Sequence, residues 1–138
     1  MTVNFEIEES IALRLNGKYI DLHNNFDFSS YDYQPQFRLF TLNFLKSNGD
    51  WIKEDEFERL IFVHTDVFFL STHYDNKQYE FPANDICLAD ITFFPASNRD
   101  INDRIILQNK PDEGDDILYI FQSEHFIRIG CDKIELIT

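Results

Sequence analysis

The sequence predicts an all-β domain, mainly antiparallel, folded as a β-sandwich or a flattened barrel of about 8–10 strands with at most one short helix. Three observations support this class. Apolar and polar residues alternate in many short segments, which is the period of a half-buried strand. Turn-forming residues recur about every eight to twelve residues. The chain also has 15 Phe, 6 Tyr and one Trp, and large flat side chains suit the space between packed sheets.

The totals indicate one domain, residues 1–138, large enough to bury a core without disulfides or metals. Cys87 and Cys131 form neither a disulfide framework nor a zinc-binding spacing, and Cys87 is expected to be a buried thiol. The first ten residues lack the basic and then apolar pattern of a signal peptide, and no run approaches the length of a transmembrane helix. We therefore expect a cytoplasmic protein.

The charge is strongly acidic. Twelve basic and 25 acidic residues give a net charge of −13. Such a field repels phosphate backbones and anionic lipids, so neither nucleic acid nor a membrane is an expected partner. It favours a protein partner with a basic surface, although an acidic surface also serves solubility alone.

The first half of the chain predicts strands over residues 3–7 and 11–15. Asn16-Gly17 follows directly and is a strong hairpin signal, so a returning strand is expected over residues 18–22. Residues 23–36 predict a long loop or an irregular edge that ends near Pro35.

Further strands are predicted over residues 37–46 and 86–94, the latter with a short helix over residues 84–89 as the alternative. Residues 57–72 form a long apolar run, which predicts a central strand or a bent pair of strands with two buried faces. Residues 74–84 are expected to be a loop. The remaining strands are expected in the last third of the chain, ending in a meander, over residues 104–107, 117–121, 126–129 and 134–137.

Two His-x-Asp units lie in or near this apolar run: His64 with Asp66, and His73 with Asp75. In an extended strand His64 and Asp66 point to the same face, where a His and a carboxylate can ligate a metal or act as a base with its orienting group. The favoured alternative is a hydrogen-bonded pair on a sheet face beside a solvated turn, so we expect no metal and no cofactor.

No motif predicts catalysis. The sequence has no Gly-rich phosphate loop, no His-Glu-x-x-His and no serine in a nucleophile-elbow context. Neither cysteine has a neighbour that would mark it as a nucleophile. We therefore do not expect an enzyme.

Acidic clusters remain as candidate protein-binding surfaces, at residues 50–58, 100–103 and 112–116. Trp51, Tyr31 and Tyr33 are candidate anchors, because Trp and Tyr are enriched among binding hot spots. The alternative is that the charge runs are solvated turns. The residues expected to contact a partner are Trp51, Glu54, Asp55, Glu56, Asp112, Glu113, Asp115 and Asp116. The last cluster lacks the spacing of a calcium loop.

The segments FRLFTLNFLK, RLIFVHTDVFFL, ICLADITFF and DDILYIF, in a small, acidic and aromatic-rich chain, resemble the immunity proteins of bacterial toxin–immunity systems. The resemblance implies a protein that binds and blocks a cognate toxin, often a basic one, through its acidic surface. Two alternatives stay open: a β-barrel that binds a small apolar ligand, and a metal-dependent enzyme that uses His64 and Asp66. The strand order and the oligomeric state also stay open.

Overall fold

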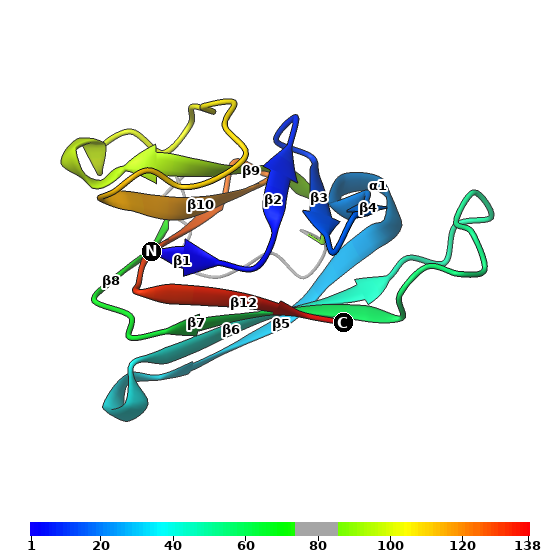
Figure 1. Cartoon of the computed structure of the whole chain (residues 1–138), viewed down its shortest axis with the longest axis horizontal. Coiled ribbons are helices and arrows are strands. Elements are labelled where there is room, and N and C mark those ends of the chain that lie inside the picture. Colours follow the sequence, from blue (N-terminus) through cyan, green and yellow to red (C-terminus); the bar gives the residue numbers. More distant parts are fainter. Residues whose placement is uncertain (74–85) are drawn as a thin grey trace.

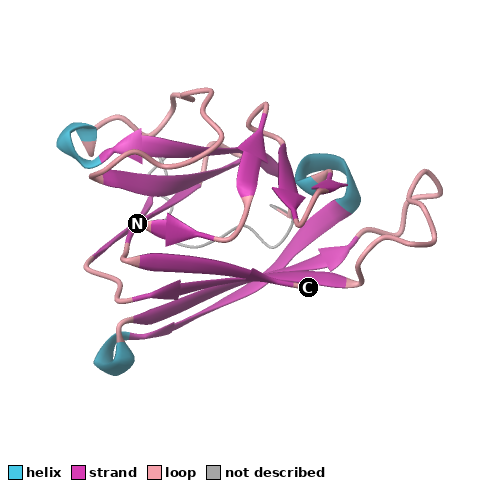
Figure 2. Cartoon of the chain, in the orientation of Figure 1, coloured by secondary structure: helices cyan, strands magenta, loops and turns pink. Residues whose placement is uncertain are grey.

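The strands form three open sheets (Figures 1 and 2). The computed structural model describes residues 1–73 and 86–138. The first sheet has the spatial order β1 (Thr2–Val3), β12 (Lys133–Ile137), β7 (Arg59–Thr65), β6 (Leu39–Lys46), β5 (Phe26–Gln34). The second has the order β8 (Phe69–His73), β11 (Phe126–Gly130), β10 (Asp115–Phe121), β9 (Leu88–Pro95). The third has the order β2 (Glu6–Glu8), β3 (Ala12–Leu15), β4 (Lys18–Ile20).

Helical structure in the described residues is limited to α1 (Leu22–Asn25) and two 3-10 turns, η1 (Pro35–Phe37) and η2 (Ala96–Asn98). Neighbouring strands are antiparallel, except that β1 and β12 are parallel. The predicted all-β class with at most one short helix is confirmed, and the sheets pack as a sandwich rather than closing into a barrel. No helix of the described chain is long and apolar enough to cross a membrane.

The N-terminal alternation predicted one strand over residues 3–7, but the structure divides it between β1 and β2 in different sheets. Asn4 accounts for the break. Its side-chain amide donates to the Leu136 carbonyl at 3.1 Å, and its side-chain oxygen accepts from the Leu136 amide at 2.8 Å. The Asn4 side chain therefore bonds the β12 backbone where a backbone group of the next residue of β1 would otherwise pair, and the chain leaves the first sheet.

Other predictions for the separate strands are confirmed. β3 and β4 form the hairpin that Asn16-Gly17 predicted. Residues 23–36 are an irregular edge, because α1 leads into the edge strand β5, which carries a bulge between Phe28 and Ser30. β9 is the predicted strand rather than a helix, and the loop predicted over residues 74–84 lies outside the described residues.

The long apolar run is a bent pair of strands, the second of the two predicted alternatives. β7 lies in the first sheet and β8 in the second, and the chain turns between them at Asp66, which has a φ of 57°. Val67 is buried but Phe68 is 62% exposed, so the run does not bury both of its faces throughout.

The C-terminal strands do not form the predicted meander. β10 and β11 pair as a hairpin, but β12 crosses to the first sheet and pairs with β7. The connection from β11 to β12 and the connection from β7 to β8 both cross between the two sheets, and they lie side by side. The Asp132 amide donates to the Thr65 carbonyl at 3.2 Å, and the Phe68 amide donates to the Gly130 carbonyl at 2.9 Å. The pairing of β8 with β11 and of β7 with β12 follows from this arrangement.

The strand predicted over residues 104–107 is also wrong. This segment has no regular structure, and Ile106 bonds a side chain instead of a neighbouring strand. Its amide donates to the Thr92 hydroxyl at 3.0 Å, and the same hydroxyl is placed to donate to its carbonyl at 3.0 Å. Residues 104–107, which were predicted to be a strand, therefore lie beside β9 without pairing with its backbone.

The first and second sheets face each other (Figure 1), and the apolar core lies between them and continues onto the third sheet, whose Leu13 and Ile20 are also buried in it. Phe62 of β7 is at its centre and meets three rings edge-to-face: Phe5 at 5.6 Å, Phe44 at 5.8 Å and Tyr119 at 5.5 Å between centroids. Edge-to-face pairs of this kind add about 0.5–1.5 kcal/mol each to the burial of their area. Ten aromatic side chains of the described residues are buried, whereas six are exposed: Tyr19, Tyr31, Tyr33, Phe37, Trp51 and Phe68.

One buried hydrogen bond joins the two sheets inside this core. His64 of β7 donates from Nδ1 to the Phe40 carbonyl at 2.8 Å, and its Nε2 accepts from the Tyr119 hydroxyl of β10 at 2.8 Å. Both side chains are fully buried. Burial lowers the pKa of His64 from 6.5 to about 4 and raises the pKa of Tyr119, so the pair is neutral.

We expect the fold to lose stability in mild acid because of His64. Its pKa is lower in the folded chain than in the unfolded chain, so between pH 6.5 and about 4 the unfolded chain binds more protons. This contribution is complete above pH 6.5, and about 3 kcal/mol is lost as the pH falls to about 4. Urea unfolding of the wild type and of His64→Gln across this range measures it. The wild-type stability should fall more steeply than that of His64→Gln, and parallel curves would contradict the assignment.

Candidate protein-binding site

The structure separates the two members of the first His-x-Asp unit. His64 is in the core with both ring nitrogens bonded, whereas the Asp66 carboxylate is exposed and pairs with Arg38 at 3.1 Å. Asp66 follows the end of β7 in a left-handed conformation, so the expected placement of both side chains on one face is wrong. The His73 side chain and Asp75 lie outside what the structure describes. Within the described residues, no three His, Cys, Asp or Glu side chains are grouped to hold a metal ion.

The acidic cluster at residues 112–116 divides into an exposed and a buried half. Asp112 and Glu113 are exposed on the turn before β10. Asp115 is buried, and its carboxylate accepts from the Asp112 amide at 2.8 Å and from the Gln108 side chain at 2.7 Å. Asp116 is 1% exposed. The expectation that all four residues face a partner is therefore wrong for Asp115 and Asp116.

The Asp116 carboxylate pairs with two arginines. Arg99 donates to both of its oxygens at 2.9 Å, and the fully buried Arg128 donates from Nε to Oδ2 at 2.8 Å. Arg128 also donates to the carbonyls of Pro95, Asn98 and Ile101 and to the Asn102 side chain. Its charge is thus used to fix the segment after β9 to the second sheet, which is a structural role.

The acidic cluster at residues 50–58 lies on the loop that joins β6 to β7, and this loop projects beyond the sheets (Figure 1). At the base of the loop the Lys46 amide donates to the Glu58 carbonyl at 2.9 Å. The Ser47 amide donates to the Asn25 carbonyl of α1 at 2.9 Å. The loop is therefore attached to α1 as well as to its own strands.

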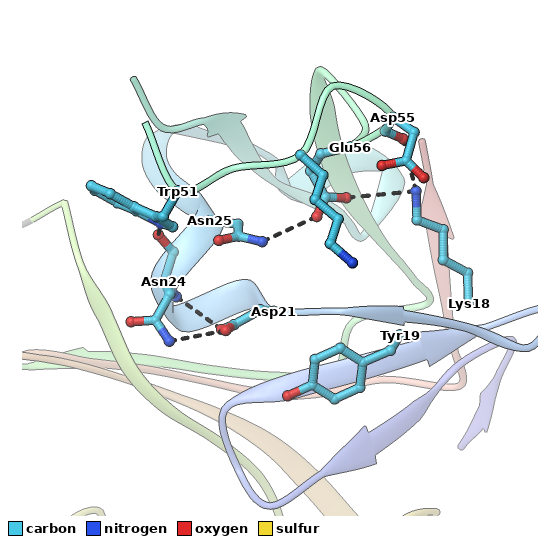
Figure 3. Close-up of a pocket in the computed structure, with 9 residues that line it drawn as sticks. Lys18, Tyr19, Asp21, Asn24, Asn25, Trp51, Asp55 and Glu56 are labelled. Carbon is cyan, nitrogen blue, oxygen red and sulfur yellow. Dashed lines mark hydrogen bonds and ion pairs between the residues drawn. The ribbon is translucent and has the colours of Figure 1, made fainter. Parts of the chain in front are cut away.

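A pocket of about 530 Å³ lies between this loop, β4 and α1 (Figure 3). Most of the residues that line it are polar or charged, and two are aromatic. The lining residues are Lys18, Tyr19, Asp21, Asn24, Asn25, Trp51, Lys53, Asp55 and Glu56. Loop residues that the sequence singled out therefore share a concave site with residues that come more than 25 positions earlier.

Glu56 is directed into the fold rather than towards a partner. Its carboxylate accepts from the Asn25 side chain at 3.1 Å and from the Phe57 amide at 3.1 Å, and it lies 3.8 Å from the Lys18 ammonium. Lys18 also donates to the Asp55 carbonyl at 2.9 Å and lies over the Phe57 ring. Glu56 and Lys18 thus hold the loop against β4, and the expectation that Glu56 faces a partner is wrong.

The other acidic residues of the loop remain available. Glu54 and Asp55 are exposed. In the part of the chain that the structure describes, no ion pair involves Asp50, Glu54 or Asp55, whereas Glu58 pairs with Lys46 at 2.7 Å. Carboxylates without an ion pair among the described residues therefore lie on the projecting loop.

Trp51 is 66% exposed yet held in place. Its indole Nε1 donates to the Asn24 carbonyl at 3.2 Å, which bridges the loop to α1. Gly49 lies directly against the ring, since a Cβ added at Gly49 would overlap the six-membered ring of the indole. Asp21 supports the same wall by capping α1, because its carboxylate accepts from both the amide and the side chain of Asn24.

A second group of exposed aromatics lies at the opposite end of β6. Tyr31 and Tyr33, both predicted as anchors, are 52% and 39% exposed and pack on Phe40. Phe37 and Phe68 are 68% and 62% exposed on the adjoining turns, and no sequence pattern singled them out. The residues 100–103 cluster keeps Asp100 and Asp103 exposed near the start of the loop after η2.

Comparison of the chain with protein-family models, with curated proteins and with solved structures finds no match. The site therefore has to be interpreted from its own geometry.

Removing the Asp116 charge should destabilise the fold strongly. Asp116→Asn leaves the fully buried Arg128 without its counterion, and the loss of one partner of a buried pair costs about 3–5 kcal/mol. Asp112→Asn is the matched control on the exposed half of the cluster, and it should change the free energy of unfolding by less than about 0.5 kcal/mol. Denaturant titration of both variants measures the difference. Equal stabilities would show that Asp116 does not balance Arg128.

Proposed function

We propose that this chain is a non-enzymatic protein-binding module whose β6–β7 loop docks on a partner with a basic surface. The observation that carries the proposal is that one projecting loop holds both an exposed but fixed Trp51 and the carboxylates of Asp50, Glu54 and Asp55, which form no ion pair within the described residues. Aromatic anchors of this kind dominate binding hot spots, and complementary charge accelerates association.

Within this class, the particular function we propose is that of an immunity-type protein, which blocks a cognate toxin. The net charge of −13 supports a basic protein as the partner rather than a nucleic acid or a lipid surface. Residues 50–58 alone carry five carboxylates and one lysine. The resemblance of the chain to small acidic immunity proteins points the same way.

The chemistry of the core supports a binding role over an enzymatic one. Both ring nitrogens of His64 are occupied by Phe40 and Tyr119, and the pKa of Cys131 is raised by burial to about 12, which keeps that thiol protonated. Cys87 is half-buried rather than buried as expected, and neither cysteine forms a disulfide. We propose the cytoplasm as its location.

The proposal predicts that binding to the partner depends on the loop charges and not only on net charge. Asp50→Asn/Glu54→Gln/Asp55→Asn should weaken capture of the partner about tenfold or more, since it removes the carboxylates that attract a basic surface. The matched control, Glu9→Gln/Glu124→Gln/Asp132→Asn, removes the same charge from exposed positions outside the three acidic clusters and should bind as the wild type does.

The measurement is capture from an extract of the encoding organism with all three proteins as baits, followed by titration of the purified partner at low and high salt. Loss of affinity in high salt is expected, because the Debye length falls from about 30 Å at 0.01 M to about 8 Å at 0.15 M. Blocking of a toxic activity of the partner by the wild type and not by the loop variant tests the immunity role. Equal capture by the loop variant and the control would refute the loop as the docking surface.

A further inference from the structure

We infer that the outer face of Trp51 is a stacking platform for an arginine side chain of the partner, and that the pocket beside it supplies the countercharge. This inference rests on the proposed function and names the chemical group that the site takes. Trp51 forms one side of the pocket, and Tyr19 and Asp55 line other parts of it (Figure 3).

The hydrogen-bonding capacity of Trp51 is already used, which leaves only its π face for a ligand. The indole has one donor, Nε1, and that donor is committed to the Asn24 carbonyl at 3.2 Å. Gly49 lies against the six-membered ring, but 66% of the side chain is still exposed. Because the Trp51 indole is held by Asn24 at its N–H and by Gly49 at the six-membered ring, it is preorganised to accept a planar group on its exposed face.

The charges around the ring select a cation. Asp21 and Asp55 line the pocket, and Asp50 and Glu54 are on the same loop as Trp51. Two lysines also line it, but Lys18 is balanced by Glu56 and held by the Asp55 carbonyl and the Phe57 ring. Among the described residues that line the pocket, Lys53 is thus the one unbalanced cation, and it faces the carboxylates of Asp21 and Asp55.

A guanidinium fits this site better than an ammonium. It is planar, weakly hydrated and stacks on aromatic faces, and its fork of donors matches a carboxylate such as that of Asp55. The pocket, at about 530 Å³, has room for an arginine side chain beside its own Lys18. Trp is also the ring that binds cations most strongly.

The test uses two peptides of equal charge, hexa-arginine and hexa-lysine, titrated against the full chain by calorimetry. Trp51 is the single tryptophan, so its fluorescence reports this site alone. We expect hexa-arginine to bind more tightly than hexa-lysine and to change the emission of Trp51. Trp51→Ala should weaken hexa-arginine about two- to thirtyfold, the range expected for a cation–π contact from an exposed to a desolvated site, and should change hexa-lysine binding by less than about twofold.

Three further variants separate stacking from loop folding. Gly49→Ala keeps the indole but displaces it, so it should lower the affinity for hexa-arginine. Because Trp51 is retained, its fluorescence still reports the binding. Trp51→Phe keeps a ring without the bond to Asn24 and should fall between the wild type and Trp51→Ala. Phe37→Ala removes an aromatic of similar exposure, 68%, at the other end of β6 and should have no effect. Thermal unfolding of each variant confirms that it is folded.

The outcomes distinguish this inference from the function on which it rests. Salt-sensitive binding of both peptides with no effect of Trp51→Ala or Gly49→Ala refutes the stacking platform and leaves the acidic docking loop. Binding of hexa-arginine that needs Trp51 but is unchanged in Asp50→Asn/Glu54→Gln/Asp55→Asn supports stacking on Trp51, refutes Asp55 as its countercharge and counts against the acidic loop. Absence of binding by either peptide refutes both.

Discussion

The arrangement of the two main sheets depends on one place where two connections cross between them side by side. The Asp132 amide bonds the Thr65 carbonyl and the Phe68 amide bonds the Gly130 carbonyl, so each connection satisfies backbone groups of the other. The contact is close, since a Cβ at Gly130 would lie 2.7 Å from an Asp116 oxygen and 2.8 Å from the Phe68 ring. Asp66 reaches this point only through a positive φ, which its ion pair with Arg38 supports. A slip of either strand pair would break all of these contacts together.

The buried polar groups also hold together the place where the two connections cross, which we call the structural joint. His64 and Tyr119 bond across the core from β7 to β10, and Asp116 and Arg128 join β10 to β11 at the crossing. Buried His, Asp, Arg and Tyr side chains often mark active sites, but here each of them is hydrogen-bonded to another group of the fold. The partner of His64 is 55 positions away in the chain, so no local spacing could have revealed its role. The sequence favoured a hydrogen-bonded pair of His64 and Asp66 over a metal site. His64 is hydrogen-bonded, but to Phe40 and Tyr119 and not to Asp66.

Most individual strands were predictable, because alternation and turn chemistry are local properties. Their assignment to sheets was not. The last three strands were expected to be neighbours, but β12 is drawn to β7 by the crossing. Residues 104–107 have strand propensity, yet Ile106 meets only the Thr92 side chain. At the site, composition identified Trp51, Glu54 and Asp55 but not the wall formed by Asp21, Asn24 and Lys18. It also could not tell that Glu56, Asp115 and Asp116 turn inward, since burial is decided by partners elsewhere in the chain.

The β6–β7 loop, for which we propose docking, and the structural joint lie at opposite ends of β7, which begins at Arg59 beside the loop and ends at Thr65 beside the crossing. Seven residues of strand separate them by roughly 20 Å at about 3.3 Å per residue. The loop has its own attachments, through Lys18, Asn24 and Asn25, so its shape does not depend on the crossing. A partner that stacks on Trp51 therefore meets a surface that is already formed and places no strain on the core. Sequence change in the loop can alter the choice of partner while the joint that fixes the sheets stays the same.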